Sequence, residues 1–524
     1  MRSQLAEFRR YHVGLRQFLR TTVTEAECAD RLRRELENRE RSFLDVLERG
    51  VFADPASPYR ALFEHAGIEL GDVTLLVADE GIEGALERLH DAGVYVTRDE
   101  FRGAAPIARS GLDLVVRDED FDNRLVKTVQ RGTTGGSRSL GRRLLLNFEH
   151  FEYGTYNLGL FRLAHDLSGR PEAIWRPIPA RTGLNLALRS VKLGRPLEKW
   201  FTQTRFGERP YPVRGRVMTW HALLMCRRAG RPLPYPEHVP YSEAVRIARW
   251  LEAKARQGTP AHFGGPVGSV VRVCLAALDH GLDISGSFLR AGGEPLTPER
   301  AAVFASTGSR FASSYAMAEV GRVGLACAAP TAVDDGHLML EKLAVLQRPR
   351  RVPRSGEIVN ALFFTTLLHS APKLMINVET DDYAVVEDRN CGCAIGELGF
   401  TRHLHTVRSY EKLTSEGMTL RGAEVVTLLE RTLPSRFGGA PTDYQLVEEL
   451  DGAVPSLSIV VSPRVGEIDE RDVVETVLSE LAQGGPAGQD VSRIWRDAQT
   501  LRVVRREPYA TRRMSKILPV HVRR

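Results

Sequence analysis

The stretch Gly292-Gly293-Glu294-Pro295-Leu296 is followed by Ser313-Ser314-Tyr315-Ala316-Met317-Ala318-Glu319-Val320-Gly321. Paired glycines let a backbone approach a flat ligand closely, and a tyrosine ring offers a face for stacking. Glu319 supplies a hard oxygen ligand of the kind that magnesium prefers. Taken alone, the two segments also fit a turn and the start of a helix, so their meaning depends on the rest of the chain.

A second glycine-rich stretch lies upstream, in Arg131-Gly132-Thr133-Thr134-Gly135-Gly136-Ser137, directly after a strand candidate at Leu125–Val129. In such a loop, backbone N–H groups converge on an anion and the hydroxyls add further donors. The spacing differs from G-x-x-x-x-G-K-[ST], which excludes a Walker-type phosphate loop. A phosphate site and an ordinary Gly/Ser surface loop both remain open at this point.

In this order the segments resemble the adenylate-forming superfamily of acyl-CoA synthetases, peptide-synthetase adenylation domains and luciferases. The resemblance covers nearly the whole chain. Its phenylacetate–CoA ligase-like branch is indicated by five further segments: Gly81–Leu86, Gly93–Thr97, Pro372–Leu374, Leu420–Gly422 and Asp443–Leu446. The resemblance implies an α/β fold, with a large N-terminal domain of β-sheets flanked by helices and a small mobile C-terminal α/β lid domain. We place these domains at residues 1–407 and 408–524.

The resemblance also implies roles for individual residues. Thr133 and Thr134, with Gly132 and Gly135, look like the phosphate loop, and Glu319 looks like the magnesium ligand. The residues that look like the contacts to adenine, ribose and the hinge are Gly292, Gly293, Glu294, Ser314, Tyr315, Asp382 and Lys412. Lys516 resembles the C-terminal lysine that stabilises the acyl adenylate.

Several positions depart from the family pattern. The phosphate loop lacks its closing lysine, Ala316 and Ala318 replace Gly and Thr, and Ser515 replaces the glycine before Lys516. The hinge arginine is missing, and Lys412 or Arg408 could substitute for it. These departures leave the fold prediction intact, but they keep open a catalytically decayed nucleotide-binding homologue.

The cysteines suggest a separate metal site. Cys391-Gly392-Cys393 is a tight pair of soft ligands, and Cys327 and His337 lie upstream of it. Four sulfur and nitrogen ligands close a tetrahedral structural zinc site. Ordinary buried thiols are the alternative, although some members of the branch carry a similar arrangement with zinc.

Composition narrows the class of protein. The chain has 524 residues, 43% of them apolar, six cysteines and a net charge of +6. Its length predicts more than one domain, and its few cysteines argue against a disulfide scaffold. No segment has the apolar length of a membrane span or a signal peptide, and no nucleic-acid recognition motif accompanies the basic C-terminus. We expect a cytoplasmic protein that binds neither nucleic acid nor membrane.

The activity that the resemblance implies is ATP-dependent activation of a carboxylic acid to an acyl adenylate. The expected acid is of aryl or arylacetic type, and the expected acceptor is the thiol of CoA. A carrier-protein thiol or an amine would use the same first step. His221 and His262 lie in the region that lines the acyl pocket of similar enzymes, as substrate contacts or as ordinary core residues.

Overall fold

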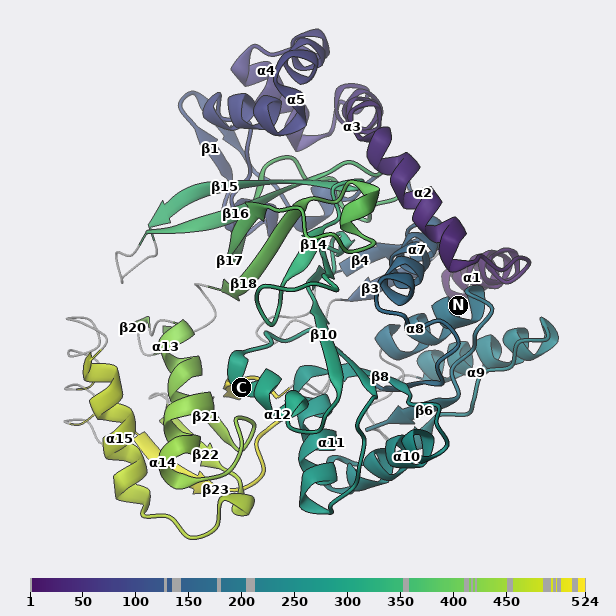
Figure 1. The fold of residues 1–524 in the computed structure, drawn as a ribbon. Helices are drawn as coiled ribbons and strands as arrows, with labels where there is room; N and C mark the ends of the chain where they lie inside the picture. The colour runs from purple at the N-terminus through teal and green to yellow at the C-terminus, as the bar shows by residue number, and fades with distance from the viewer. Residues whose placement is uncertain are drawn as a thin grey trace.

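The computed structural model describes residues 2–126, 130–133, 143–176, 181–203, 213–351, 358–409, 414–415, 418–419, 422–449, 456–483, 492, 496, 501–510 and 517–523. These residues form an α/β fold around two six-stranded sheets and one four-stranded sheet (Figure 1). Among the described helices, none combines the length and apolar character needed to cross a bilayer.

The first six-stranded sheet is wholly parallel, in the order β10-β9-β8-β5-β6-β7. Its strands are β5 (Glu172–Trp175), β6 (Lys199–Thr202), β7 (Glu237–His238), β8 (His262–Pro266), β9 (Phe288–Gly292) and β10 (Arg310–Ser314). Every residue of β5, β8 and β9 is buried, as expected for parallel strands covered on both faces. The carboxyl ends of such strands share one edge, which is the usual place for a ligand.

Helices cover both faces of this sheet. Ala173 and Trp175 pack on one face against α10 (Val245–Arg256), α11 (Val267–Asp279) and α12 (Pro298–Ala305). Ile174 points the opposite way, as the two-residue period of a strand requires. It packs with a second group of helices: α1 (Arg2–Phe18), α8 (Arg181–Lys192) and α9 (Val213–Arg228).

The second six-stranded sheet has the order β13-β14-β18-β17-β16-β15, and its neighbouring strands are antiparallel. Its strands are β13 (Gly324–Ala326), β14 (Gly336–Leu338), β15 (Leu343–Arg351), β16 (Ile358–Thr366), β17 (Val378–Asp388) and β18 (Arg402–Ser409). Buried residues of β15, β16 and β17 share a core with α3 (Arg39–Leu47), α4 (Pro58–Ala66) and α5 (Leu70–Asp91), above the parallel sheet in Figure 1. Helix α7 (Phe148–Ala164) and α2 (Glu25–Glu37) contribute to another core with residues near the cysteines.

The C-terminal part of the chain has its own hydrophobic core. It surrounds a sheet in the order β23-β22-β21-β24 and includes α15 (Glu470–Gln483). The strands are β21 (Tyr444–Glu449), β22 (Ser456–Val461), β23 (Leu501–Arg505) and β24 (Val520–Arg523). This region lies beside α11 and α12 (Figure 1), where Arg464 pairs with Asp279 at 2.5 Å and Arg272 with Glu507 at 3.2 Å. A domain boundary at residue 408 stays a prediction.

The sequence-based elements agree with the structure where the apolar pattern is long. The strand expected over Ile358–Thr366 is β16, and the helix expected from Val267 is α11. The strand expected at Leu125–Val129 is shifted along the chain: β3 occupies Gln130–Thr133, and residues 127–129 lie outside the described residues. After Ser314 the chain forms a hairpin of β11 (Ala316–Met317) and β12 (Gly321–Arg322), so a helix start there is wrong. Gly321 has φ +76, which suits a tight turn better than a helix.

Candidate functional site

Several predicted nucleotide residues lie at the carboxyl ends of two neighbouring parallel strands, β9 and β10. Gly292 ends β9 and pairs in register with Ser314, which ends β10. Gly293 has φ +81, a left-handed conformation that glycine adopts without strain. The backbone therefore turns away from the sheet at the point where the sequence predicted a flat ligand.

Tyr315 and Asp382 are brought together from segments far apart in the chain. The Tyr315 hydroxyl donates a hydrogen bond of 2.6 Å to Oδ2 of Asp382, which lies in β17. Burial, with the nearby charges of Asp382, Glu319 and Asp381, raises the pKa of Tyr315 well above its usual value. Three of the residues that the resemblance singled out thus lie around one tyrosine hydroxyl: Tyr315, Glu319 and Asp382.

Glu294 is held by the protein itself. Its Oε2 accepts from the Gly268 N–H and from Arg300, both at 3.1 Å. Arg300 also pairs at 2.7 Å with Glu430 of the C-terminal region, and all three side chains are buried. This carboxylate positions the loop after β9, and a direct contact with a nucleotide stays a prediction.

The predicted catalytic lysine cannot be placed, but the residue after it can. Lys516 lies outside the described residues, as does the predicted hinge residue Lys412. Ile517 is buried over Gly268, so closely that a Cβ on that glycine would lie 3.3 Å from the Ile517 Cβ. The end of the C-terminal region therefore reaches the glycine that bonds Glu294.

The predicted phosphate loop is described only at its beginning. Gly132 and Thr133 lie in β3, paired with Leu144 and Arg143 of β4 (Arg143–Leu146). Thr134 and Gly135 lie outside the described residues. Their role in phosphate binding stays a prediction.

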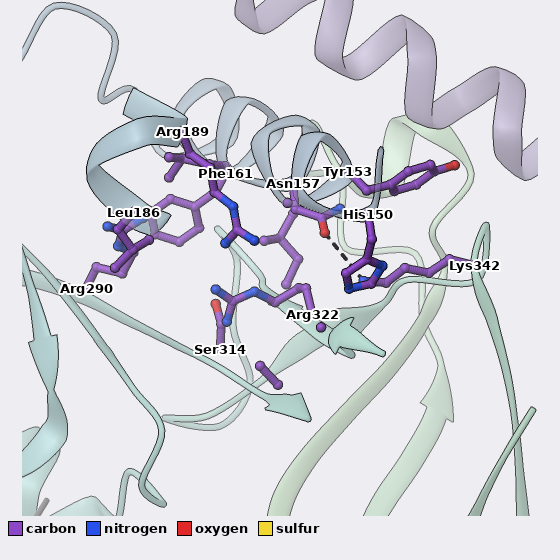
Figure 2. Close-up of a pocket in the computed structure, with 15 residues that line it drawn as sticks. His150, Tyr153, Asn157, Phe161, Leu186, Arg189, Arg290, Ser314, Arg322 and Lys342 are labelled. Atoms are coloured by element: carbon purple, nitrogen blue, oxygen red, sulfur yellow. Dashed lines mark hydrogen bonds between the residues drawn. The ribbon is translucent and has the colours of Figure 1, made fainter. Parts of the chain in front are cut away.

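A cavity of about 120 Å³ opens beside these strand ends, between α7 and the β11–β12 hairpin. Figure 2 shows Arg189 and Arg322 extending toward its centre, with Arg290 near one end and Lys342 beside His150 at the other. Of the predicted nucleotide residues that the structure describes, Ser314 alone lines the cavity. The cavity is therefore adjacent to the nucleotide residues but distinct from them.

The cavity has a strongly cationic lining that the sequence did not reveal. Burial and the charges of Arg290, Arg189 and Arg176 lower the pKa of Arg322 to about 9. Burial and Arg290 lower the pKa of Arg189 to about 10. Arg290 lies in β9, Arg189 in α8, Arg176 directly after β5 and Arg322 in the β11–β12 hairpin. No spacing in the sequence connects these four arginines.

Neither predicted pocket histidine lines this cavity. His221 lies on α9, with its Nε2 3.1 Å from His12 Nδ1 of α1. His262 is buried with Nδ1 3.7 Å from Glu172, and burial lowers its pKa well below the ordinary value. His262 is thus a core residue beneath the charged groups, while His150 occupies the cavity wall.

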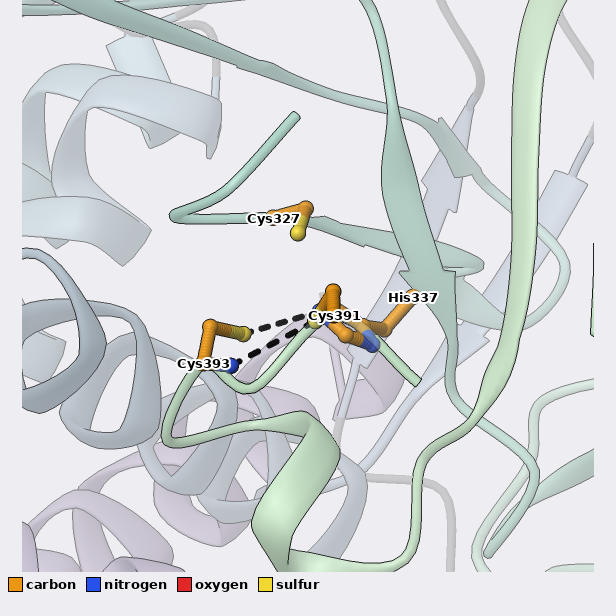
Figure 3. A group of neighbouring side chains, drawn as sticks. All are labelled: Cys327, His337, Cys391 and Cys393. Carbon is orange, nitrogen blue, oxygen red and sulfur yellow. Dashed lines mark hydrogen bonds between the residues drawn. The ribbon is translucent and has the colours of Figure 1, made fainter. Parts of the chain in front are cut away.

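The predicted metal ligands Cys327, His337, Cys391 and Cys393 do converge (Figure 3). Their three sulfur atoms and one imidazole nitrogen lie within 4.8 Å of one another. His337 Nε2 is 3.1 Å from Cys393 Sγ and 3.7 Å from Cys391 Sγ. Tetrahedral zinc places its ligands at similar separations, because Zn–S is about 2.3 Å and Zn–N about 2.0 Å.

The surroundings of the cluster also fit a metal. His337 Nδ1 lies 2.6 Å from the Phe400 carbonyl oxygen, so the ring donates there and keeps the Nε2 lone pair for a ligand. The Ala329 N–H donates to Cys327 Sγ at 3.3 Å, as suits a thiolate. The donor set, burial and tautomer therefore match a closed structural zinc site, whose metal identity stays a proposal.

Comparison with known proteins supports the fold through structure alone. No protein-family model and no curated protein matches the chain. The structure is similar to 2-hydroxyisobutyryl-CoA ligase in the postadenylation state in complex with R3-HIB-AMP, with a TM-score of 0.52 and 14% identity over 96% of this chain and 91% of that chain. The same ligase with 2-HIB-AMP gives a TM-score of 0.47 at 14% identity, covering 94% of this chain and 89% of that one. Fatty acyl-adenylate ligases from E. coli and L. pneumophila give a TM-score of 0.42 at 12% identity, covering 75% of this chain and 68% of that one.

At this identity, likeness to a solved structure establishes architecture and not substrate or branch. The similarity extends over nearly the full length of both chains. The predicted phenylacetate–CoA ligase-like branch stays a prediction. The chain has the fold of the adenylate-forming enzymes.

Proposed function

We propose that this protein is an AMP-forming ligase, which activates a carboxylic acid with ATP and transfers the acyl group to a thiol. The observation that carries this proposal is the 2.6 Å bond between Tyr315 and Asp382, beside the glycine turn after β9. It places a ring, an acidic residue and a close-approaching backbone at one sheet edge. The architecture supports the proposal, since the similar ligase was captured with an acyl-AMP.

In the first step, a carboxylate oxygen of the acid attacks the α-phosphorus of ATP. A new O–P bond forms, the bond from that phosphorus to the bridging oxygen breaks, and pyrophosphate leaves. This reaction needs alignment and charge stabilisation more than a protein nucleophile. Tyr315 would stack on adenine, Asp382 would bond the ribose hydroxyls, and the loop from Gly132 to Gly135 would hold the phosphates.

Glu319 is the residue that we propose to hold magnesium. Glu319 as a residue is only 7% exposed, and its charge helps to raise the pKa of Tyr315. A buried carboxylate beside the expected nucleotide suits a hard cation. When bound, magnesium would offset negative charge on the ATP phosphates.

We assign the zinc to structure. Cys327 and Cys393 belong to a hydrophobic core with α2 and α7, and neither lines the cavity. Four protein ligands would leave no open coordination position, which is the mark of a structural site. The metal would tie the chain around Cys391 to β14.

The second step is thioester formation. The thiol sulfur attacks the acyl carbonyl carbon, the C–O bond to AMP breaks, and AMP leaves. CoA is the acceptor that we propose, with a carrier-protein thiol or an amine as the alternatives. Residues 408–524 would act as the lid that rotates between the two steps.

Pyrophosphate exchange into ATP, measured with a panel of carboxylic acids, tests the first step. Lys516→Ala should lower the exchange rate by roughly 10²–10³-fold, because its charge acts on the reacting phosphates. It should leave ATP binding intact, since Tyr315 and Asp382 lie in the other part of the chain. Glu319→Gln should weaken the magnesium dependence as well as the rate.

Lys199→Ala is the matched control, because Lys199 is a surface residue paired with Glu237. It should exchange like the wild type. Absence of exchange with every acid, or a Lys516→Ala variant as active as the wild type, would contradict the proposal. If no acid supports exchange, the departures at Ala316, Ala318 and Ser515 would indicate a decayed site.

A further inference from the structure

The cavity between α7 and the β11–β12 hairpin holds more positive charge than its carboxylates can neutralise. Arg290 pairs with Glu172 at 3.1 Å, but Glu172 also pairs with Arg162. Within the described residues, Arg189 and Arg322 form no ion pair, and Arg189 Nε is buried without a hydrogen-bond partner. Two guanidinium groups therefore enter the cavity without a counter-ion from the described chain.

These cations also act on one another. Arg176, directly after β5, has its pKa lowered to about 10 by burial and by Arg290, partly offset by Glu294. Burial lowers the pKa of Lys342 to about 7, with Glu341 acting in the opposite direction and Arg322 and Arg189 adding to the fall. Like charges are gathered here at the expense of stability, which suggests that the native arrangement is completed by an anion.

The chain makes specific room for these side chains. A Cβ on Gly154 of α7 would collide with the Arg189 guanidinium, and one on Gly264 of β8 would lie 3.1 Å from Arg290 Nη2. Arg189 lies 5.0 Å above the Phe151 ring and Arg290 lies 5.7 Å above the Phe161 ring. The guanidinium groups are thus seated by small residues and aromatic faces on α7 and β8.

We infer that this cavity binds a second anionic group on the acid substrate, so that the enzyme activates a short acid carrying a further carboxylate or phosphate. This inference rests on the proposed function, because it takes the cavity as the acyl side of the site. Paired guanidinium groups bind carboxylate and phosphate oxygens in bidentate fashion. Arg189 and Arg322 are the residues that would hold this second group.

Position and size favour the acid over the phosphates of ATP. Within the described part of the chain, Ser314 is the only predicted nucleotide residue that lines the cavity, and Asp382 and Gly293 do not. The volume of about 120 Å³ is close to the approximately 150 Å³ of a cavity that holds benzene. The space thus suits a few heavy atoms and is too small for a nucleotide. The aryl acid expected from the resemblance is disfavoured, because its ring would leave the cations unpaired.

Matched acids that differ in one charge test the inference. We would measure pyrophosphate exchange with malonate, succinate, glutarate and adipate, each beside its monoamide, and with 3-phosphonopropionate. The monoamide has nearly the same shape as the diacid but lacks the second charge. At least one diacid should exceed its monoamide by about 10-fold or more, since a hydrogen bond to a charged group is worth about 1.5–3 kcal/mol.

Arg322→Gln should remove this preference. It should lower kcat/KM for the best diacid by about 10-fold or more while leaving the monoamide and the KM for ATP nearly unchanged. Arg33→Gln is the control, because Arg33 is exposed on α2 and pairs only with Asp30 at 3.0 Å among the described residues. A similar rise in the KM for ATP and for the diacid would assign the cavity to the ATP phosphates and overturn the inference.

The remaining outcomes separate the two proposals. Exchange that is as fast with the monoamides as with the diacids would overturn the inference and leave the adenylating activity standing. If no acid supports exchange, the proposed function fails, and a binding measurement tests whether the cavity takes an anion. Titration calorimetry with glutarate and the other diacids should show binding that Arg322→Gln loses. Absence of diacid binding to the wild type would end the inference as well.

Discussion

The cysteine–histidine cluster and the cationic cavity are both assembled from distant segments, yet they differ in how their charges balance. Cys327, Cys391, Cys393 and His337 bring their ligand atoms within 4.8 Å, a set that one divalent cation satisfies. In the cavity, Arg189 and Arg322 find no such partner among the described residues. The two clusters therefore carry opposite net charge, which is why we propose a cation for one and an anion for the other.

A third charged group shows what a complete cluster looks like. Arg300 lies fully buried between Glu294 and Glu430, at 3.1 and 2.7 Å. It needs no ligand, because its own chain supplies both carboxylates.

Loss of the metal should have the largest effect. Cys393→Ala should abolish binding of about one zinc per chain and destabilise the fold by several kcal/mol, because zinc binding by such sites is worth about 10 kcal/mol or more. Elemental analysis and urea denaturation measure both results. Cys274→Ala, in the core of α11 away from the cluster, should keep the metal. A wild-type chain without zinc would make the cluster a set of ordinary thiols.

Breaking the ion pairs of Arg300 with Glu294 and Glu430 should have the second-largest effect on stability. Arg300→Met leaves Glu294 and Glu430 buried without their cation, which should lower the free energy of unfolding by about 3–5 kcal/mol. The double variant Arg300→Met/Glu430→Gln should recover part of this loss, since one of the stranded charges is removed. Equilibrium urea unfolding compares the three proteins. Equal stability of single and double variants would show that the two carboxylates are not coupled through Arg300.

Lowering the pH should destabilise the folded protein through His150, which lines the cavity. Burial, with Lys342 and Arg189, lowers the pKa of His150 from about 6.5 to about 3. Between these values the unfolded chain binds a proton that the folded chain does not, so the free energy of unfolding falls as the pH falls. The loss should be about 2–3 kcal/mol between pH 6.5 and pH 4.5 for this group.

The variant His150→Gln isolates that contribution. Its free energy of unfolding should depend less steeply on pH over the same window, while His65→Gln, at an exposed position, should keep the wild-type slope. Unfolding by guanidinium chloride, measured at successive pH values, gives both slopes. Identical slopes for His150→Gln and the wild type would show that His150 is not held neutral by its surroundings.

Removing one positive charge from the cavity should have the smallest effect on stability, and it should not destabilise the protein. Without any acid present, Arg322→Gln should leave stability unchanged or raise it by on the order of 1 kcal/mol, because one of several like charges is removed. Thermal unfolding in buffer that lacks polyvalent anions measures this. A clear loss of stability would mean that Arg322 already has a partner in the folded chain.

Sequence patterns predicted much of this molecule where the information is local. The apolar content of Ile358–Thr366 predicted β16, and the helical pattern from Val267 predicted α11. The close spacing of Cys391 and Cys393 identified half of the metal cluster, and the resemblance to a known family supplied Tyr315 and Asp382. The hairpin after Ser314 was missed, because its turn depends on Gly321 at positive φ rather than on a periodic pattern.

The α/β fold followed from the sequence, and the sequence predicts donors for a nucleotide and a soft metal, because strand periods, glycine pairs and cysteine spacing act over short distances. The cationic lining of the cavity became visible only in the three-dimensional structure. Arg189, Arg290 and Arg322 lie on separate elements, and each alone resembles a surface arginine. Their meaning arises when the fold buries them around one space, because burial and mutual repulsion depend on distance in three dimensions rather than along the chain.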